Sequence, residues 1–185
     1  MTQHHSGLHL LPSMSENLGL PWEIPEASLT RVLELACQNY QHVIVDLPRQ
    51  LDPLTSSVIE HADTILLVMQ QSLTHLRDAK RLLQLFTNEL GVAQEATEIL
   101  VNRYSEKNPI SLHDIRQTLK RDELVTIPND YRRVSESVNA GEPLYENARG
   151  AAVTRTLQRL AQRLAGTPEF RKENVLHRAV SYLFT

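Results

Sequence analysis

Polar side chains that could bind a ligand follow three apolar stretches of the sequence. Asp46 comes directly after "VIV", Gln70 and Gln71 follow "ILLVM", and Asn102 follows "EILV". In open parallel sheets, ligands bind beyond the carboxyl ends of the strands, so polar residues at those ends are candidates for function. A carboxylate such as Asp46 is the group that holds Mg²⁺ beside a phosphate. The alternative for each position is structural, because strand-end residues also start turns and cap helices.

These residues can act together only if their strands share one sheet. Short apolar runs alternate with longer segments of helical period, which is typical of an α/β fold. We predict three layers, with a mainly parallel sheet of about five strands and flanking helices. The strands are expected at residues 7–12, 42–46, 63–70, 97–102 and 124–130. The helices are expected at residues 28–40, within 53–62, and at 73–90, 111–120, 130–139 and 151–165.

Three of the predicted helices carry signals that fix their faces or their ends. The segment 73–90 places five apolar residues at helical spacing and stops at Gly91. These residues are Leu76, Ala79, Leu83, Phe86 and Leu90. "SLHD" (111–114) resembles a capping box at the start of the helix expected at 111–120. Asn129 or Asp130 is expected to cap the helix at 130–139.

Composition and charge exclude several classes of function. The chain has 185 residues, a formal net charge of -3 and one cysteine, Cys37, which rules out an internal disulfide. The negative charge gives no reason to expect nucleic acid as a partner, although Arg132 and Arg133 could touch phosphate. No apolar run reaches the ~20 residues of a membrane span, and "MTQHHSGLHLLPS" lacks the pattern of a signal peptide. The expected location is the cytoplasm.

Four ordered motifs together resemble a known family. They are "VIVDLPRQLDP" (43–53), "ADTILLVMQQSLTHLRDAKRLL" (62–83), "ILVNRY" (99–104) and "TIPNDYRRVSESVNAGEPLYE" (126–146). They are similar to the second half of a MinD/ParA-type ATPase of the deviant Walker A superfamily. More narrowly they resemble its CpaE/TadZ branch, which serves the assembly and polar placement of Flp-type (type IVb) pili. The resemblance covers roughly residues 6 to 165, and "DLPRQLDPLT" is its most particular segment.

The resemblance implies ATP and Mg²⁺ as ligands and assigns a role to each motif. Asp46 matches the catalytic Walker B acid that helps hold Mg²⁺. The switch segment that reports on the γ-phosphate matches Leu47, Pro48, Arg49, Gln50 and Asp52. Asn102 matches the asparagine that reads the adenine edge, a task suited to its paired donor and acceptor. The loop beside the base matches Ile127, Pro128 and Asp130.

The phosphate-binding part of such a site has no counterpart in the sequence. The family's loop is Gly-rich and carries Gly-Lys-Ser/Thr, whereas none of the six glycines here is followed by lysine. We therefore expect residues 1–165 to be the C-terminal portion of a MinD/ParA-like domain. We do not expect this portion to hydrolyse ATP by itself. In the family the phosphate-loop strand lies between the two strands predicted at 43–45 and 65–68. Without it, these strands are expected to pair directly, or another chain is expected to fill the gap.

The last residues, 166–185, form an amphipathic tail with an apolar stripe. The stripe consists of Val175, Leu176, Ala179, Val180, Leu183 and Phe184. A helix packed on its own domain or on a dimer partner is the first expectation, and membrane contact, as in MinD, is the alternative. The resemblance implies a homodimer, pilus or secretion assembly proteins as partners, and recruitment to the cell pole or the inner membrane face.

Other functions remain as alternatives. The chain could be a non-catalytic interaction module of the same fold that recruits partners without turnover. A flavodoxin-like or receiver-type domain would use Asp46 as an acceptor carboxylate, but the acidic pair that such domains need is missing. "HHSGLH" (4–9) places three histidines close together without the Cys or acidic ligands of a metal site. No G-x-S-x-G or G-x-G-x-x-G motif is present.

Overall fold

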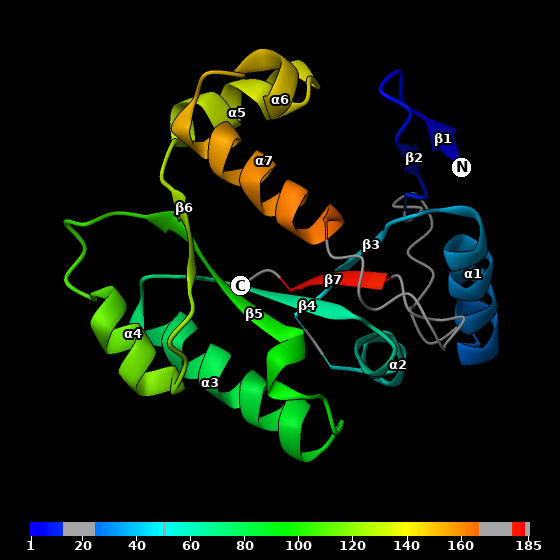
Figure 1. Ribbon diagram of the computed structural model, residues 1–185, viewed down its shortest axis with the longest axis horizontal. Helices are drawn as coiled ribbons and strands as arrows, with labels where there is room; N and C mark the ends of the chain where they lie inside the picture. Colours follow the sequence, from blue (N-terminus) through cyan, green and yellow to red (C-terminus); the bar gives the residue numbers. More distant parts are fainter. Residues whose placement is uncertain (13–24, 50, 167–178, 184–185) are drawn as a thin grey trace.

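A five-stranded parallel sheet forms the centre of the computed structural model, which describes residues 1–12, 25–49, 51–166 and 179–183 (Figure 1). Its strand order is β3-β7-β4-β5-β6. The strands span Val43–Leu47 (β3), Thr64–Gln70 (β4), Thr97–Tyr104 (β5), Val125–Pro128 (β6) and Ala179–Leu183 (β7). All four neighbouring pairs are parallel, so the carboxyl ends of the strands meet at one edge of the sheet.

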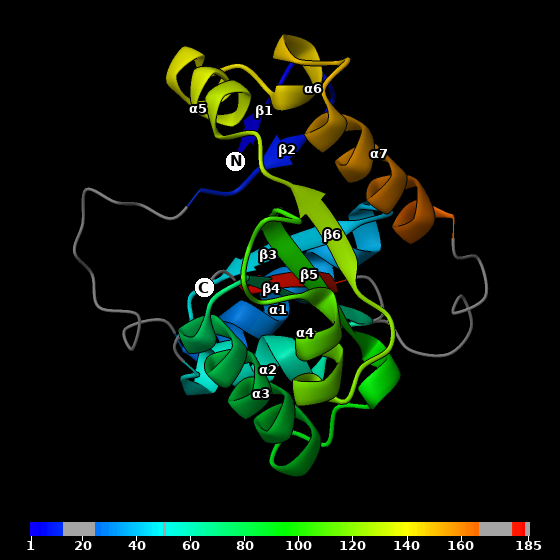
Figure 2. The same ribbon diagram turned by 90° about the vertical axis from the view of Figure 1, so that its left-hand side faces the viewer.

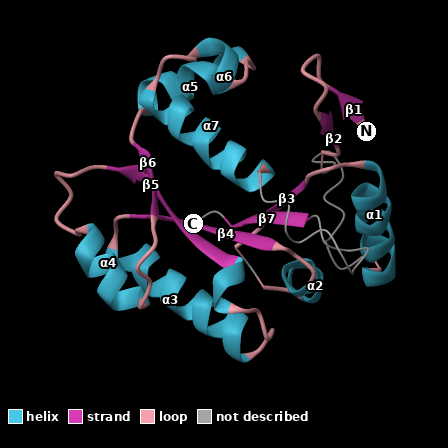
Figure 3. Ribbon diagram, viewed as in Figure 1, coloured by secondary structure: helices cyan, strands magenta, loops and turns pink. Residues whose placement is uncertain are grey.

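Helices cover both faces of this sheet, which gives three layers (Figures 2 and 3). The helices are α1 (Glu26–Asn39), α2 (Pro53–Glu60), α3 (Leu73–Asn88), α4 (Leu112–Leu119), α5 (Tyr131–Ala140), α6 (Leu144–Asn147) and α7 (Ala152–Ala165). Residues of α2, α3 and α4 form one buried cluster with Ile65, Leu67 and Met69 of β4. Residues of α7 pack against Leu66 and Val68 on the opposite face. The predicted three-layer α/β architecture is confirmed.

The alternation of side chains along β4 explains both cores. Ile65 and Leu66 are neighbours in sequence, yet each is fully buried in a different cluster, because successive strand residues point to opposite faces. A strand covered on both faces must be apolar throughout, as "ILLVM" is. The helix predicted at 73–90 is present as α3, and its predicted apolar residues Leu76 and Phe86 are buried in the larger cluster.

Polar side chains start several helices, and the sequence predicts two of these caps, at α4 and α5. Ser111 and Asp114 form a complete capping box at α4. Asp130, one of the two candidates, caps α5 by accepting a hydrogen bond from the Arg133 N–H. Asp52 caps α2 by accepting from the Thr55 N–H at 2.7 Å. These caps satisfy backbone donors that have no partner inside the helix.

The strand expected at residues 7–12 is wrong as a member of the main sheet. Only His9–Leu10 forms a strand there, β2, and it pairs antiparallel with β1 (Thr2–Gln3) in a separate two-stranded sheet. The chain turns between them at Gly7, whose positive φ of 87° suits glycine. A local hairpin therefore takes up the apolar residues that the pattern assigned to the sheet.

The missing fifth strand comes from the tail. Residues Ala179–Leu183 form β7, which lies between β3 and β4 and is parallel to both (Figure 1). The expectation that β3 and β4 pair directly, or that another chain fills the gap, is therefore wrong. The amphipathic helix expected in the tail is also not what residues 179–183 adopt, while Val175, Leu176 and Phe184 lie outside the described residues. Unpaired edges in the middle of a sheet are costly, which is the physical reason for a strand here.

Candidate functional site

Asp46 lies near the carboxyl end of β3 with an exposed side chain. Val45 and Leu47 pack into the larger core, so Ile44 and Asp46 point to the opposite face, on which α7 packs further along the sheet. Ile44 is 60% exposed, which shows that the described residues leave this part of the face open. An accessible carboxylate on an open face suits Mg²⁺, which is often bound by one or two carboxylates together with phosphate oxygens.

Asn102 lies on the same face of the sheet, near the end of β5. It pairs in register with Gln70, and Leu100 before it belongs to the α7-side cluster. Its side chain is half-buried, and its Oδ1 accepts a hydrogen bond of 2.9 Å from the Arg103 N–H. The ladder to β6 is irregular between Val101 and Tyr104, so Asn102 sits at a β-bulge. Bulges are common beside functional sites, where they change the direction of a side chain.

The exit of β6 lies beside this bulge. Ile127 is buried on the α7 side, Pro128 pairs with Tyr104, and the Asn129 N–H donates to the Tyr104 carbonyl at 3.2 Å. Asp130 follows as the α5 cap. The structure therefore brings Asn102, Ile127, Pro128 and Asp130 into one corner of the sheet, and their role beside a base stays a prediction.

Asp46 and Asn102 share a face but are not in contact. Asp46 is level with Leu66 through Tyr182, whereas Asn102 is level with Gln70, four positions further along β4. Strands β7 and β4 lie between them. Standard strand spacings then put the two Cα atoms about 20 Å apart. Only an extended ligand could reach both residues.

The predicted switch segment is tied to the helices around it. Leu47 is buried, Leu51 packs on the larger core and Asp52 caps α2, while Gln50 lies outside the described residues. Pro48 is exposed. Arg49 donates to the carboxylate of Asp78 on α3, a partner that the sequence motifs did not indicate. The structure thus gives Arg49 a contact with α3, and its predicted role toward a phosphate stays a prediction.

The strand-end glutamines differ in what they do. Gln71 is buried, and its amide joins two backbone groups of the loop after β5: Nε2 donates to the Ile110 carbonyl, and Oε1 accepts from the Ser105 N–H. Gln70 is half-buried, and its backbone N–H donates to His75 Nδ1. Gln71 therefore stabilises the loop that follows β5 through these two hydrogen bonds. Its position in the sequence does not reveal this role.

Asp130 gives the site a pH-dependent contact. A hydrogen bond from the Arg133 guanidinium, at 2.7 Å, holds the pKa of the Asp130 carboxyl below its usual value. A depressed folded-state pKa stabilises the fold above the ordinary carboxyl pKa of about 4, and this contribution is lost as pH falls through the folded value. We expect Asp130→Asn to lower the melting temperature at pH 7 and to show a smaller deficit near pH 2, where more of the parent's Asp130 is protonated. Thermal unfolding at the two pH values tests this, and an equal deficit at both would contradict it.

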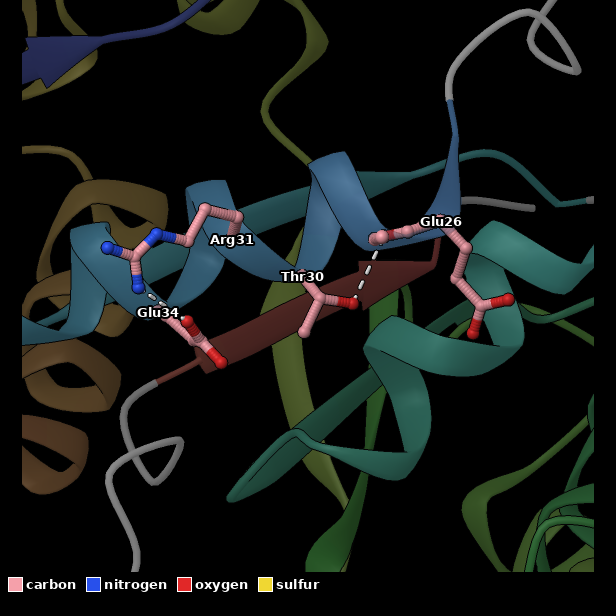
Figure 4. A pocket seen from close by; sticks show the side chains of 5 residues that line it. Glu26, Thr30, Arg31 and Glu34 are labelled. Atoms are coloured by element: carbon pink, nitrogen blue, oxygen red, sulfur yellow. Dashed lines mark hydrogen bonds and ion pairs between the residues drawn. The ribbon is translucent and has the colours of Figure 1, made fainter.

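Two other features do not contribute to this site. A hollow of about 450 Å³ is lined by five residues of α1, where Arg31 pairs with Glu34 (Figure 4). It contains none of the strand-end residues. Among the described residues, no three His, Cys, Asp or Glu side chains gather as a metal site. His9 instead contacts the Tyr40 hydroxyl, and His5 contacts Glu146.

Known proteins are similar to this chain in fold or in sequence. The crystal structure of a ParA family ATPase from Chlorobium tepidum TLS superposes with a TM-score of 0.79 and 27% identity over 89% of this chain and 67% of that one. The putative septum site-determining protein MinD of Mesostigma viride is 28% identical over 138 residues, 72% of this chain and 47% of that protein. The sporulation initiation inhibitor protein Soj of Bacillus subtilis (strain 168) is 28% identical over 141 residues, 69% of this chain and 54% of that protein.

The sheet, its helices and these likenesses define a protein of the MinD/ParA superfamily. Within it, residues 3–164 match the family model of the cellulose biosynthesis protein BcsQ, and the chain belongs to that family. The chain spans about half the length of the MinD and Soj relatives. None of the helices in the described part of the chain is long and apolar enough to cross a membrane.

Proposed function

We propose that this chain forms the Walker B and base-side portion of an ATP-dependent switch protein of the CpaE/TadZ kind, which assembles and places Flp-type (type IVb) pili. One observation carries the nucleotide part of the proposal: Asp46 and Asn102 lie on one face of the sheet, near the carboxyl ends of their strands, and neither is fully buried. This is where open α/β sheets bind ligands.

Each group in this proposal has a defined task. Asp46 would hold Mg²⁺, which in such a site neutralises charge on the phosphates. Asn102 would read the base, with Pro128 and Asp130 beside it. The switch segment would transmit the state of the γ-phosphate to α3, because Arg49 is bonded to Asp78 there. The group that binds most of the phosphate charge is not supplied by any glycine-lysine sequence of this chain.

The proposed partners follow from the same role. The protein would act as a homodimer with nucleotide between the subunits and would contact pilus or secretion assembly proteins at the cell pole or the inner membrane face. The alternative within the same fold is a non-catalytic scaffold that recruits these components without turnover. The weak support for autonomous phosphate binding favours this alternative for the isolated chain.

The name of the matched family supports a second candidate for the assembly that this protein serves. The matched family is described as a cellulose biosynthesis protein, so the switch could serve a cellulose-exporting assembly instead of a pilus. Removing the gene separates the two. Loss of surface pili with normal cellulose supports the pilus role, and loss of cellulose with normal pili overturns it.

Isothermal titration with Mg-ATP tests the nucleotide part. We expect the isolated chain to bind more weakly than micromolar, because the phosphate-binding part of the site is missing. Micromolar binding that Asp46→Ala abolishes would contradict this view of the chain. Asp63→Ala, at the start of the β4 region, is the control for a general effect of removing a carboxylate. Reading the codons upstream of Met1 is an independent check, because an in-frame Gly-Lys-Ser/Thr loop would supply the missing part.

A further inference from the structure

The β-bulge beside Asn102 inserts one residue into β5. Val101 pairs with Thr126 and Tyr104 pairs with Pro128, so Asn102 and Arg103 together oppose Ile127 alone. Val101 and Tyr104 both pack on the larger core although they are three positions apart. In a regular strand, residues separated by an odd number of positions would point to opposite faces. Because of the inserted residue, Tyr104 points to the same face of the sheet as Val101.

Arg103 adopts a left-handed backbone conformation at this bulge, with φ of 51°. Among the described residues, Lys120 is the other non-glycine residue with positive φ, and it has an ordinary reason, because it ends α4. Arg103 lies within a strand, where an L-residue adopts this conformation only if its surroundings compensate for the cost. Its guanidinium lies 5.8 Å from the centre of the Tyr131 ring, at the start of α5.

At this bulge the Arg103 N–H lies beside the side chain of Asn102. The N–H donates to Asn102 Oδ1 at 2.9 Å. Because an N–H can bond only to the carbonyl oxygen of the amide, this contact decides which way the Asn102 amide is turned. Rotating the amide by half a turn would place its NH₂ against the Arg103 N–H. No described residue accepts a hydrogen bond from Asn102 Nδ2, so that group remains available to a ligand.

We propose that Arg103 is a positioning residue for base selectivity. Its left-handed conformation maintains the bulge, and its N–H within the bulge fixes the Asn102 amide, which makes the site selective for adenine over guanine. The inference rests on the proposed function, because it concerns the base-side part of the same site. It adds to that function an explanation of base specificity, namely the Arg103 backbone N–H that bonds to the Asn102 side chain.

The chemistry of the two bases explains the selectivity. A carboxamide can pair with the Watson–Crick edge of adenine by donating to N1 and accepting from the N6 amino group. Oδ1 has two lone pairs, so it can accept from the Arg103 N–H and from the base at once. Guanine presents O6 in place of the amino group, so a fixed Oδ1 would face a second acceptor. A freely rotating amide could turn so that Nδ2 donates to guanine O6 and Oδ1 accepts from guanine N1–H, and the Arg103 contact prevents that turn.

The first test needs no nucleotide. Arg103→Val should release the amide, because a β-branched residue disfavours positive φ, whereas Arg103→Gly should keep it fixed. NMR order parameters of the Asn102 side-chain amide are expected to fall in the valine variant and to stay at the parent level in the glycine variant. Arg103→Asn is a second tolerant replacement that retains a side chain. Equal order parameters in all variants would overturn the inference.

The second test measures how tightly AMP and GMP bind to the full chain. Binding is monitored through the NMR signals of the Asn102 side-chain amide. We expect the parent protein and Arg103→Gly to favour AMP at least about fivefold, the low end for one well-placed pair of hydrogen bonds. Arg103→Val should bring the ratio close to one. Unchanged selectivity in a folded valine variant would overturn the inference.

The two tests separate this inference from the proposed function. If neither nucleotide shifts the Asn102 signals of the parent protein at millimolar concentration, the proposed base site fails, and adenine selectivity fails with it. The ligand-free order parameters still decide whether Arg103 fixes the amide. A far-ultraviolet circular dichroism spectrum and melting curve of each variant confirm that the comparison is between folded proteins.

Discussion

Ser181→Pro is expected to unfold the protein or to cost it about 3 kcal/mol or more of unfolding free energy. The Ser181 backbone pairs with Val45 on one side and with Ile65 on the other. Proline lacks the N–H that such a position needs and is excluded from central strands. Among the described residues, β3 has no sheet partner except β7, so weakening β7 also releases β3. Urea denaturation followed by circular dichroism measures the loss.

Ser181→Ala is the matched control, because it changes the side chain and leaves the backbone able to pair. We expect its unfolding midpoint to lie close to that of the parent protein. If the proline and alanine variants were equally stable, β7 would not occupy the centre of the sheet. Loss of stability in both would instead point to the side chain, and the backbone argument would be wrong.

Phe86→Ala is the second large effect, with an expected loss of about 3–5 kcal/mol. Phe86 is 1% exposed and belongs to the largest fully buried side chains, within the cluster that joins α3 to β4 and β5. Its removal leaves a cavity that the surrounding residues can close only in part. Equilibrium unfolding in urea gives the value through the shift of the midpoint at constant slope.

Gln84→Ala is the control for Phe86, because Gln84 is an exposed residue of the same helix. Its change should alter stability by less than about 0.5 kcal/mol. A loss below about 1 kcal/mol for Phe86→Ala would show that α3 does not pack on the sheet as described. Both variants leave the strand-end residues unchanged, so they separate stability from ligand binding.

The sequence predicts correctly those elements whose pattern of apolar residues fits only one type of secondary structure. The segment 73–90 is long and periodic, and it forms α3 with the predicted apolar face. The tail was misjudged because Ala179, Val180 and Leu183 fit the spacing of a helix and also the composition of a short apolar strand. Periodicity cannot separate these for so few residues. What decides the outcome is the gap between β3 and β4. The resemblance predicts this gap, but only the tertiary structure shows that residues 179–183 fill it.

The candidate site was predictable in its residue types but not in its geometry. Strand-end polar residues can be found from the apolar runs before them, and Asp46 and Asn102 were found in this way. The left-handed conformation of Arg103 leaves no trace in the sequence, because arginine has no preference for positive φ. The partner of Arg49 could not be foreseen either, because Asp78 is one of many acidic residues on helix surfaces.

The place of β7 also bears on how the protein is made. Val43 is synthesised long before its neighbour in the sheet, Ala179, because the two residues lie far apart in the sequence. Contacts between such distant parts of a chain form slowly, because a long loop must close first. We expect β3 to keep an open edge until the segment of β7 has been synthesised, and during that time it can pair with other nascent chains. Chaperone dependence during synthesis would follow from this one strand.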